Sequence, residues 1–212
     1  MNKEKVEKCQ NLISEAKTVA LVPSKIAGTD SFAAAVGLYY MLTESGKDVY
    51  FVYPGKIPDE ATNLISKDRI VSNVSERELM VTIDYAGTPA ASAHYATEGD
   101  KLIIKVGPVS KEFPKDEKIK SELVGFDFDV IIVLGAQELA DLGVTFSNLR
   151  ESFNGAKVIN IDNTERNAEY GDVNLIDVTA GSLSQQVFKL ASALNLVPGE
   201  KTANALLTGM TY

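Results

Sequence analysis

Three short and almost entirely apolar segments constrain the fold of this 212-residue chain more than any other feature of its sequence. They are residues 18–22 (TVALV), 130–134 (VIIVL) and 157–161 (KVINI). Apolar runs of this length without polar alternation are typical of strands that are buried on both faces, as in a parallel sheet covered by helices. The sequence therefore predicts an α/β fold.

Segments with helical periodicity lie between these strands. Residues 2–17 carry an apolar stripe, residues 31–45 form a largely apolar helix that Asp30 is placed to cap, and residues 182–194 begin with a capping pattern. Residues 48–53 (DVYFVY) read as the strand after the second helix. Shorter elements are expected as helices at 58–66, 137–142, 145–153 and 199–208 and as an edge strand at 174–178. We expect a mostly parallel, doubly wound sheet flanked by helices.

The middle of the chain has a different pattern. Residues 78–85 alternate like a half-buried strand, and residues 92–97 and 101–106 flank a turn typical of a hairpin. Residues 107–128 are polar and rich in proline, lysine and glutamate. We interpret residues 75–128 as an antiparallel hairpin insertion within a single domain that spans 1–212.

The charge of the chain limits its partners. It has 21 basic and 29 acidic residues, a net charge of −8. Non-specific binding to nucleic acid or to an anionic membrane surface needs a basic face, so we expect neither. No apolar run reaches the 18 residues typical of a membrane span, and the first residues lack the apolar core of a signal peptide. A cytoplasmic location is the expectation.

The chain contains one histidine, His94, and one cysteine, Cys9. These counts exclude an internal disulfide, a cysteine-rich metal site and any metal site with several histidines. Cys9 lies on the apolar stripe of the first helix and is expected in the core. His94 falls in the predicted insertion, where we expect it on the surface of a strand.

Three segments together resemble the DHH phosphoesterase superfamily, which includes RecJ-type nucleases and nano-RNase/pAp phosphatases. They are TDSFAAAVGLYYMLTESGKDVYFV from residue 29, VIIVLGAQELADLG from residue 130 and VINIDNTERNAEYGDVNLIDVTAGSLSQQVFKLASALN from residue 158. The resemblance covers most of the chain outside residues 75–128. It implies a DHH-type domain without the second, DHHA1-like domain of the family.

The resemblance also implies a chemistry, which is phosphoester hydrolysis by two manganese ions. Among the positions that match the family's ligands, Asp30 and Asp162 are retained, and Asn163 could offer one weak oxygen ligand. Other ligand positions carry residues that cannot replace carboxylates or imidazoles, namely Ser24, Gly28, Gly135 and Thr164. The two aspartates also have structural explanations, Asp30 as a helix cap and Asp162 as an acceptor for its loop.

Two functional hypotheses follow. In the first, the chain is a degenerate DHH-like protein, a pseudoenzyme without cofactor that binds a protein partner or a nucleotide. In the second, it is an active manganese-dependent phosphoesterase on oligonucleotides or small nucleotides, with a rearranged site that uses Asp30 and Asp162. A third, compatible hypothesis is self-association through residues 78–106, because exposed strand edges favour pairing.

Overall fold

The computed structural model describes residues 2–84, 92–109, 111 and 119–212. The chain divides into two compact units, which we describe separately. Unit 1 comprises residues 1–76 together with 125–212, and unit 2 comprises residues 77–124. Among the described residues, no helix is long and apolar enough to cross a membrane.

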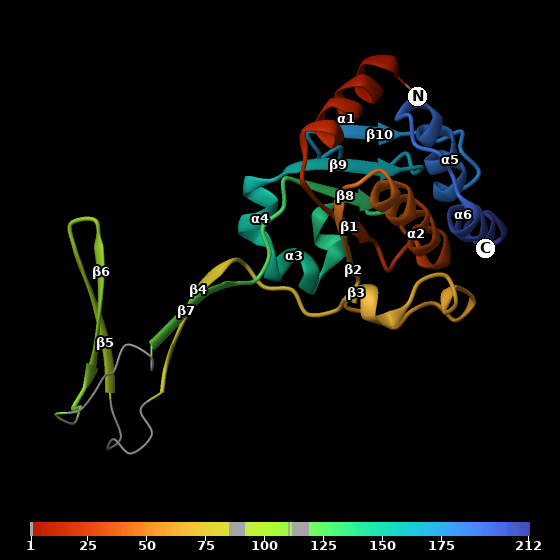
Figure 1. The fold of residues 1–212 in the computed structure, drawn as a ribbon. Coiled ribbons are helices and arrows are strands. Elements are labelled where there is room, and N and C mark those ends of the chain that lie inside the picture. The colour runs from red at the N-terminus through yellow and green to blue at the C-terminus, as the bar shows by residue number, and fades with distance from the viewer. Residues whose placement is uncertain (1, 85–91, 110, 112–118) are drawn as a thin grey trace. The chain divides into compact units, whose positions relative to one another are not determined.

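Unit 1 is built on a six-stranded sheet in which all strands are parallel (Figure 1). Its strands, in their order across the sheet, are β10 (Val173–Ile176), β9 (Lys157–Asp162), β8 (Val130–Leu134), β1 (Thr18–Pro23), β2 (Asp48–Val52) and β3 (Ile70–Val71). The predicted α/β fold with a parallel sheet is therefore confirmed. The chain moves outward from β1 to β3 on one side and from β8 to β10 on the other, so the strand order reverses between β1 and β8.

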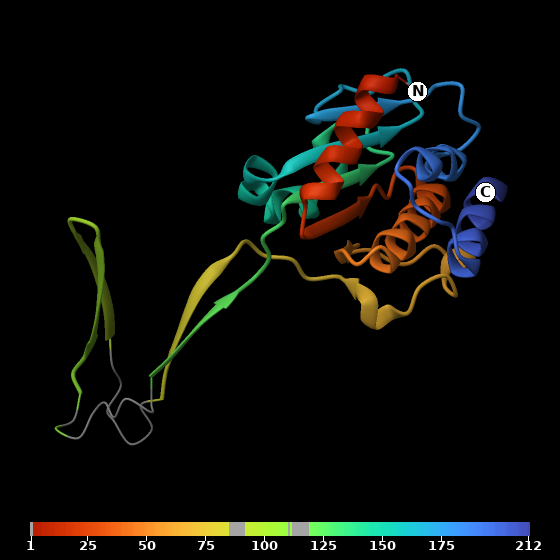
Figure 2. The same cartoon turned by 45° about the horizontal axis from the view of Figure 1, so that its top comes forward.

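Helices cover both faces of this sheet (Figures 1 and 2). On one face lie α1 (Lys3–Glu15), α2 (Gly28–Glu44), α5 (Leu183–Ala193) and α6 (Glu200–Thr211). On the other face lie a 3-10 turn (Leu139–Leu142), α3 (Val144–Asn148) and α4 (Arg150–Gly155). This arrangement is the doubly wound one that the sequence predicts.

The alternation of side chains along each strand divides the interior into two cores. In β1, Val19 and Leu21 pack with the core under α1, α2, α5 and α6, whereas Ala20 and Val22 pack with the core under α3 and α4. Both sets are buried, which explains why β1 carries no regular polar alternation.

Cys9 confirms the expectation of a core residue. It is fully buried in α1, and burial raises the pKa of its thiol to about 12. Because the thiolate is the reactive form, a thiol in this environment is inert at neutral pH.

Two local predictions are wrong. The helix predicted from residue 31 begins at Gly28, so Asp30 lies in its first turn and is not its N-cap. Residues 58–66 form a 3-10 turn at Asp59–Ala61 in place of a helix, since a segment of nine residues yields few hydrogen bonds for the cost of nucleation. The strand β7 (Ile119–Val124) was not predicted as a separate element; it lies within the polar residues 107–128 of the antiparallel insertion.

Unit 2 contains two separate antiparallel pairs of strands. The strand β4 (Glu78–Ile83) pairs with β7, and β5 (Ser92–Glu98) pairs with β6 (Lys101–Gly107) through the predicted turn. Gly99 in that turn has a φ of 58°, which glycine adopts without strain. The prediction of antiparallel strands is confirmed, but β4 is mostly exposed where a half-buried strand was expected.

Candidate functional site

The carboxyl ends of the central strands form the edge where ligands bind in open α/β sheets, at the point where the strand order reverses. In unit 1 this point lies between β1 and β8. Ser24 follows β1, Gly135 follows β8, and Asp162 is the last residue of β9. The structure therefore brings the predicted positions of the site to one edge of the sheet.

Asp30 uses both oxygens of its carboxylate to hold another helix. One oxygen accepts a hydrogen bond from the backbone N–H of Leu183 (2.6 Å), and the other accepts from the N–H of Ser184 (3.0 Å). These are free N–H groups in the first turn of α5, where the helix dipole also favours a negative charge. Asp30 thus caps α5 and not the helix at 31–45 that it was expected to cap.

Asp162 is 1% exposed and makes three hydrogen bonds. One carboxylate oxygen accepts from the backbone N–H of Asn163 (2.7 Å), and the other accepts from Thr164 Oγ1 (2.7 Å) and Asn167 Nδ2 (2.7 Å). A carboxylate can be buried in this way because its oxygens are fully paired. The expectation that Asp162 accepts from the following loop is confirmed.

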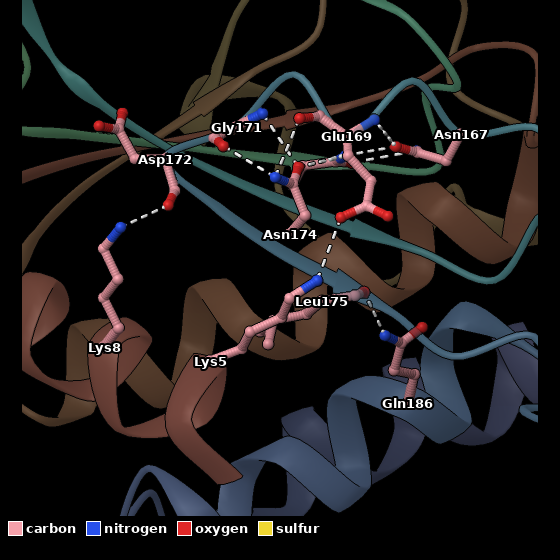
Figure 3. A network of polar contacts seen from close by, with 10 residues as sticks. Lys5, Lys8, Asn167, Glu169, Gly171, Asp172, Asn174, Leu175 and Gln186 are labelled. Atoms are coloured by element: carbon pink, nitrogen blue, oxygen red, sulfur yellow. Dashed lines mark hydrogen bonds and ion pairs between the residues drawn. The ribbon is translucent and has the colours of Figure 1, made fainter. Parts of the chain in front are cut away.

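Further polar contacts hold the loop between β9 and β10 that supplies these donors (Figure 3). The side chain of Asn174 accepts from the N–H of Gly171 (2.9 Å) and donates to the carbonyl of Glu169 (3.0 Å). From α1, Lys5 pairs with Glu169 (3.1 Å) and Lys8 donates to the carbonyl oxygen of Asp172 (2.7 Å). The loop that carries the donors around Asp162 is therefore held by Asn174 of β10 and by the two lysines of α1.

Gly135 stands where the family resemblance places an aspartate. It has a φ of 71°, in the left-handed region that favours glycine. A Cβ atom here would lie 2.7 Å from both Ala27 Cβ and Leu183 Cδ1 and 3.3 Å from Ser31 Cβ. Neighbouring side chains thus fill the space that a ligating carboxylate would need.

The residues present do not fit the two-manganese site that the resemblance implies. Both carboxylate oxygens of Asp30 and both of Asp162 accept hydrogen bonds from N–H and O–H groups of the chain. Ser24 Oγ accepts from the N–H of Ile26 (3.2 Å). Asn163 donates through Nδ2 to the carbonyl of Ala180 (3.3 Å), and its one amide oxygen cannot replace the carboxylates and imidazoles of a two-metal site. Within the described part of the chain, no three histidine, cysteine, aspartate or glutamate side chains gather where they could hold a metal ion.

The open space along the sheet edge lies beside β2 and β3. One pocket of about 390 Å³ is lined by Tyr53, Gly55, Lys56, Ile57, Asp59, Thr62, Lys67, Ile70 and Ser72. A second of about 430 Å³ is lined by Pro54, Gly55, Ser72, Asn73, Val74, Val144, Thr145 and Asn148. Sequence reasoning missed these residues because β3 is two residues long and carries no recognisable pattern, although Tyr53 ends a predicted strand and residues 54–55 directly follow it.

A parallel sheet wound on both faces, with its strand order reversed at β1 and β8, places unit 1 in the class of doubly wound α/β domains. Among solved structures, the chain is similar to an exopolyphosphatase-related protein from Bacteroides fragilis, with a TM-score of 0.64 at 15% identity. The match covers 99% of this chain and 50% of that protein, so the chain spans about half its length. No protein-family model and no curated protein sequence matches the chain.

Proposed function

We propose that this chain is a degenerate DHH-like phosphoesterase domain that does not carry out two-metal hydrolysis and acts by binding. The similarity to an exopolyphosphatase-related protein supports the phosphoesterase-like part of the proposal. One observation supports the absence of two-metal hydrolysis. Both oxygens of Asp30 and both oxygens of Asp162 already accept hydrogen bonds from the chain.

Recruiting Asp162 as a metal ligand would have a free-energy cost. A metal ion at Asp162 would compete with the donors Asn163, Thr164 and Asn167 for its oxygens, and each donor that it left buried without a partner would cost roughly 1–3 kcal/mol. Unit 1 contains no imidazole of its own, since the single histidine, His94, belongs to unit 2. The chemistry of the donor set therefore argues against the family's site.

The ligand that this edge suits best is a nucleotide or a similar small phosphorylated molecule. The pocket of about 390 Å³ beside β2 and β3 lies within the roughly 300–1,000 Å³ of small-molecule sites. It is lined by Lys56 and Lys67, and Lys56 pairs with Asp59 at 2.8 Å. A phosphate group would offer an anionic partner to both ammonium groups.

A hydrolysis assay tests the loss of catalysis. With Mn²⁺ present, we expect no turnover of pAp or of dinucleotides, and calorimetry should detect no tight binding of two Mn²⁺ ions. Manganese-dependent turnover that disappears in Asp30→Asn and Asp162→Asn, but persists in the matched control Glu165→Gln from the same loop, would show an active enzyme with a rearranged site.

Titration with nucleotides tests the binding. Calorimetry with pAp should give saturable heat, and Lys67→Glu should weaken binding about tenfold or more because it replaces an attractive charge with a repulsive one. Lys3→Glu on the exposed side of α1 makes the same change in charge away from the pocket and should have little effect. Equal weakening by both variants would argue against a site beside β2 and β3.

A further inference from the structure

The strand pair β4–β7 separates its side chains into an apolar face and a polar face. Residues that lie directly opposite each other share a face. On the apolar face the opposed pairs are Leu79 with Leu123, Val81 with Ser121 and Ile83 with Ile119. On the polar face they are Glu78 with Val124, Met80 with Glu122 and Thr82 with Lys120.

The strand pair β5–β6 shows the same separation. Its apolar face carries Ala93 with Val106, Tyr95 with Ile104 and Thr97 with Leu102. Its polar face carries Ser92 with Gly107, His94 with Lys105, Ala96 with Ile103 and Glu98 with Lys101. Two strand pairs of different sequence thus each have one apolar face and one polar face. This pattern is typical of strands with one buried side.

Among the described residues of unit 2, side chains on both apolar faces are exposed. Leu79 is 65% exposed, Tyr95 81% and Leu102 63%. An isolated two-stranded sheet is at best marginally stable in water and needs packing on its apolar face. Gathered apolar side chains of this kind mark a surface that contacts another molecule.

We propose that the apolar faces of unit 2 pack against unit 2 of a second copy of this chain. Sheets pack face to face when each offers a row of apolar side chains, which is what β4–β7 and β5–β6 present. The proposal rests on unit 2 alone and is independent of whether unit 1 hydrolyses or binds a nucleotide.

The distribution of charge permits a second copy as the occupant of unit 2 and disfavours contact between two copies through unit 1. Residues 77–124 contain seven basic and eight acidic residues, whereas the rest of the chain contains 14 basic and 21 acidic residues. Two copies that met through unit 1 would bring a net charge of −7 against −7. Contact through unit 2 brings only −1 against −1, so repulsion at the interface is small.

The size of the faces sets the expected affinity. The two apolar faces present six residues each, twelve per copy. A standard interface uses about 20–30 residues on each side, and smaller ones are weak or transient. We therefore expect a dimer with a dissociation constant on the order of micromolar.

Sedimentation velocity of the full chain tests the proposal. Between about 1 and 200 µM, a range that brackets a micromolar constant, the mass should rise from 22.9 kDa toward twice that value. Leu79→Asp and Ile104→Asp place a charge on the apolar faces and should weaken association at least tenfold. The matched controls Met80→Asp and Ala96→Asp place the same charge on the opposite faces of β4 and β5 and should not.

Chemical cross-linking gives a second readout that does not depend on an aspartate being tolerated. Leu102→Cys and Lys101→Cys put a thiol on opposite faces of β6, while the native Cys9 is buried. A short bis-maleimide should join two copies of Leu102→Cys far more efficiently than two copies of Lys101→Cys. A chain that stays monomeric throughout the concentration range, or equal cross-linking of both variants, would overturn the proposal.

Discussion

Gly135 and Asp162 show how single residues decide what the strand edge can hold. Gly135 adopts a φ of 71° beside Ala27 and Leu183, and no side chain has room there. Asp162 retains its carboxylate, but three donors of the following loop use it. Position 135 has no room for a ligating side chain, and the carboxylate of Asp162 holds the loop that follows it.

Placing an aspartate at position 135 should damage the fold. In Gly135→Asp the new Cβ would lie within 2.7 Å of two side chains at a left-handed φ. We expect the free energy of unfolding to fall by about 2–4 kcal/mol, measured by urea denaturation. Gly46→Asp is the matched control, because Gly46 has a φ of 88° with no atom within 4 Å of the added Cβ.

The control variant should lose only about 1 kcal/mol, since aspartate is among the residues that tolerate the left-handed region best. Equal losses in the two variants would mean that backbone strain alone matters. An unchanged unfolding midpoint in Gly135→Asp would mean that α2 and α5 can move apart and leave room for a carboxylate.

At the scale of elements, carboxylates that are distant in sequence satisfy the starts of two helices. Asp30 in α2 accepts from the N–H groups of Leu183 and Ser184 in α5. Glu76 accepts from the N–H groups of Glu151 (2.7 Å) and Ser152 (3.1 Å) at the start of α4. These contacts tie each helix to a distant part of unit 1 as well as stabilising its first turn.

A third carboxylate joins the starts of β1 and β8 and should make stability depend on pH. Asp129 accepts from the backbone N–H groups of Thr18 (2.9 Å) and Lys17 (2.7 Å), and these bonds lower its pKa. Because its folded-state pKa is lowered, its stabilising contribution is present above the unfolded pKa of about 3.9 and is lost as the pH falls through the folded value.

Asp129→Asn should therefore lower the free energy of unfolding at pH 7, and the difference from the unmodified chain should shrink below about pH 4. Urea denaturation at pH 7 and at pH 3 measures both values. A difference that is the same at the two pH values would show that the charge of Asp129 does not contribute.

At the scale of the whole molecule, the net charge of −8 is unevenly spread along the chain. Residues 77–124 are nearly neutral, while unit 1 carries most of the negative charge. Self-association through unit 2 would still bring two negatively charged copies together, and charges further apart than about 10 Å are screened at about 0.1 M salt.

The proposed dimer should consequently tighten as salt is raised. Between about 20 and 300 mM NaCl we expect the dissociation constant to fall severalfold, because screening removes repulsion between the two copies. Sedimentation at each salt concentration measures the change. Weakening with salt would indicate instead that ion pairs between Lys101, Lys105 and acidic residues hold the copies together.

Local patterns predicted most of the elements and missed those without a pattern. Local patterns predicted the strands β1, β8 and β9 and the helices α1 and α5. Helical periodicity and buried apolar runs can be recognised within a short stretch of consecutive residues. The strand β3 was missed, since two residues carry no periodicity. The roles of Asp30 and Gly135 were only partly predictable, since both depend on Leu183, more than forty residues away along the chain.

The sequence by itself determined the fold class and excluded a metal site with several histidine ligands. Buried apolar runs separated by helical periodicity specify a parallel sheet, and a single histidine cannot supply several metal ligands. Only the tertiary structure decided how the retained aspartates are used and which side chains surround Gly135. The reason is physical: hydrogen-bond partners and free space are set by atoms that folding brings together from distant parts of the chain, and no local pattern records them.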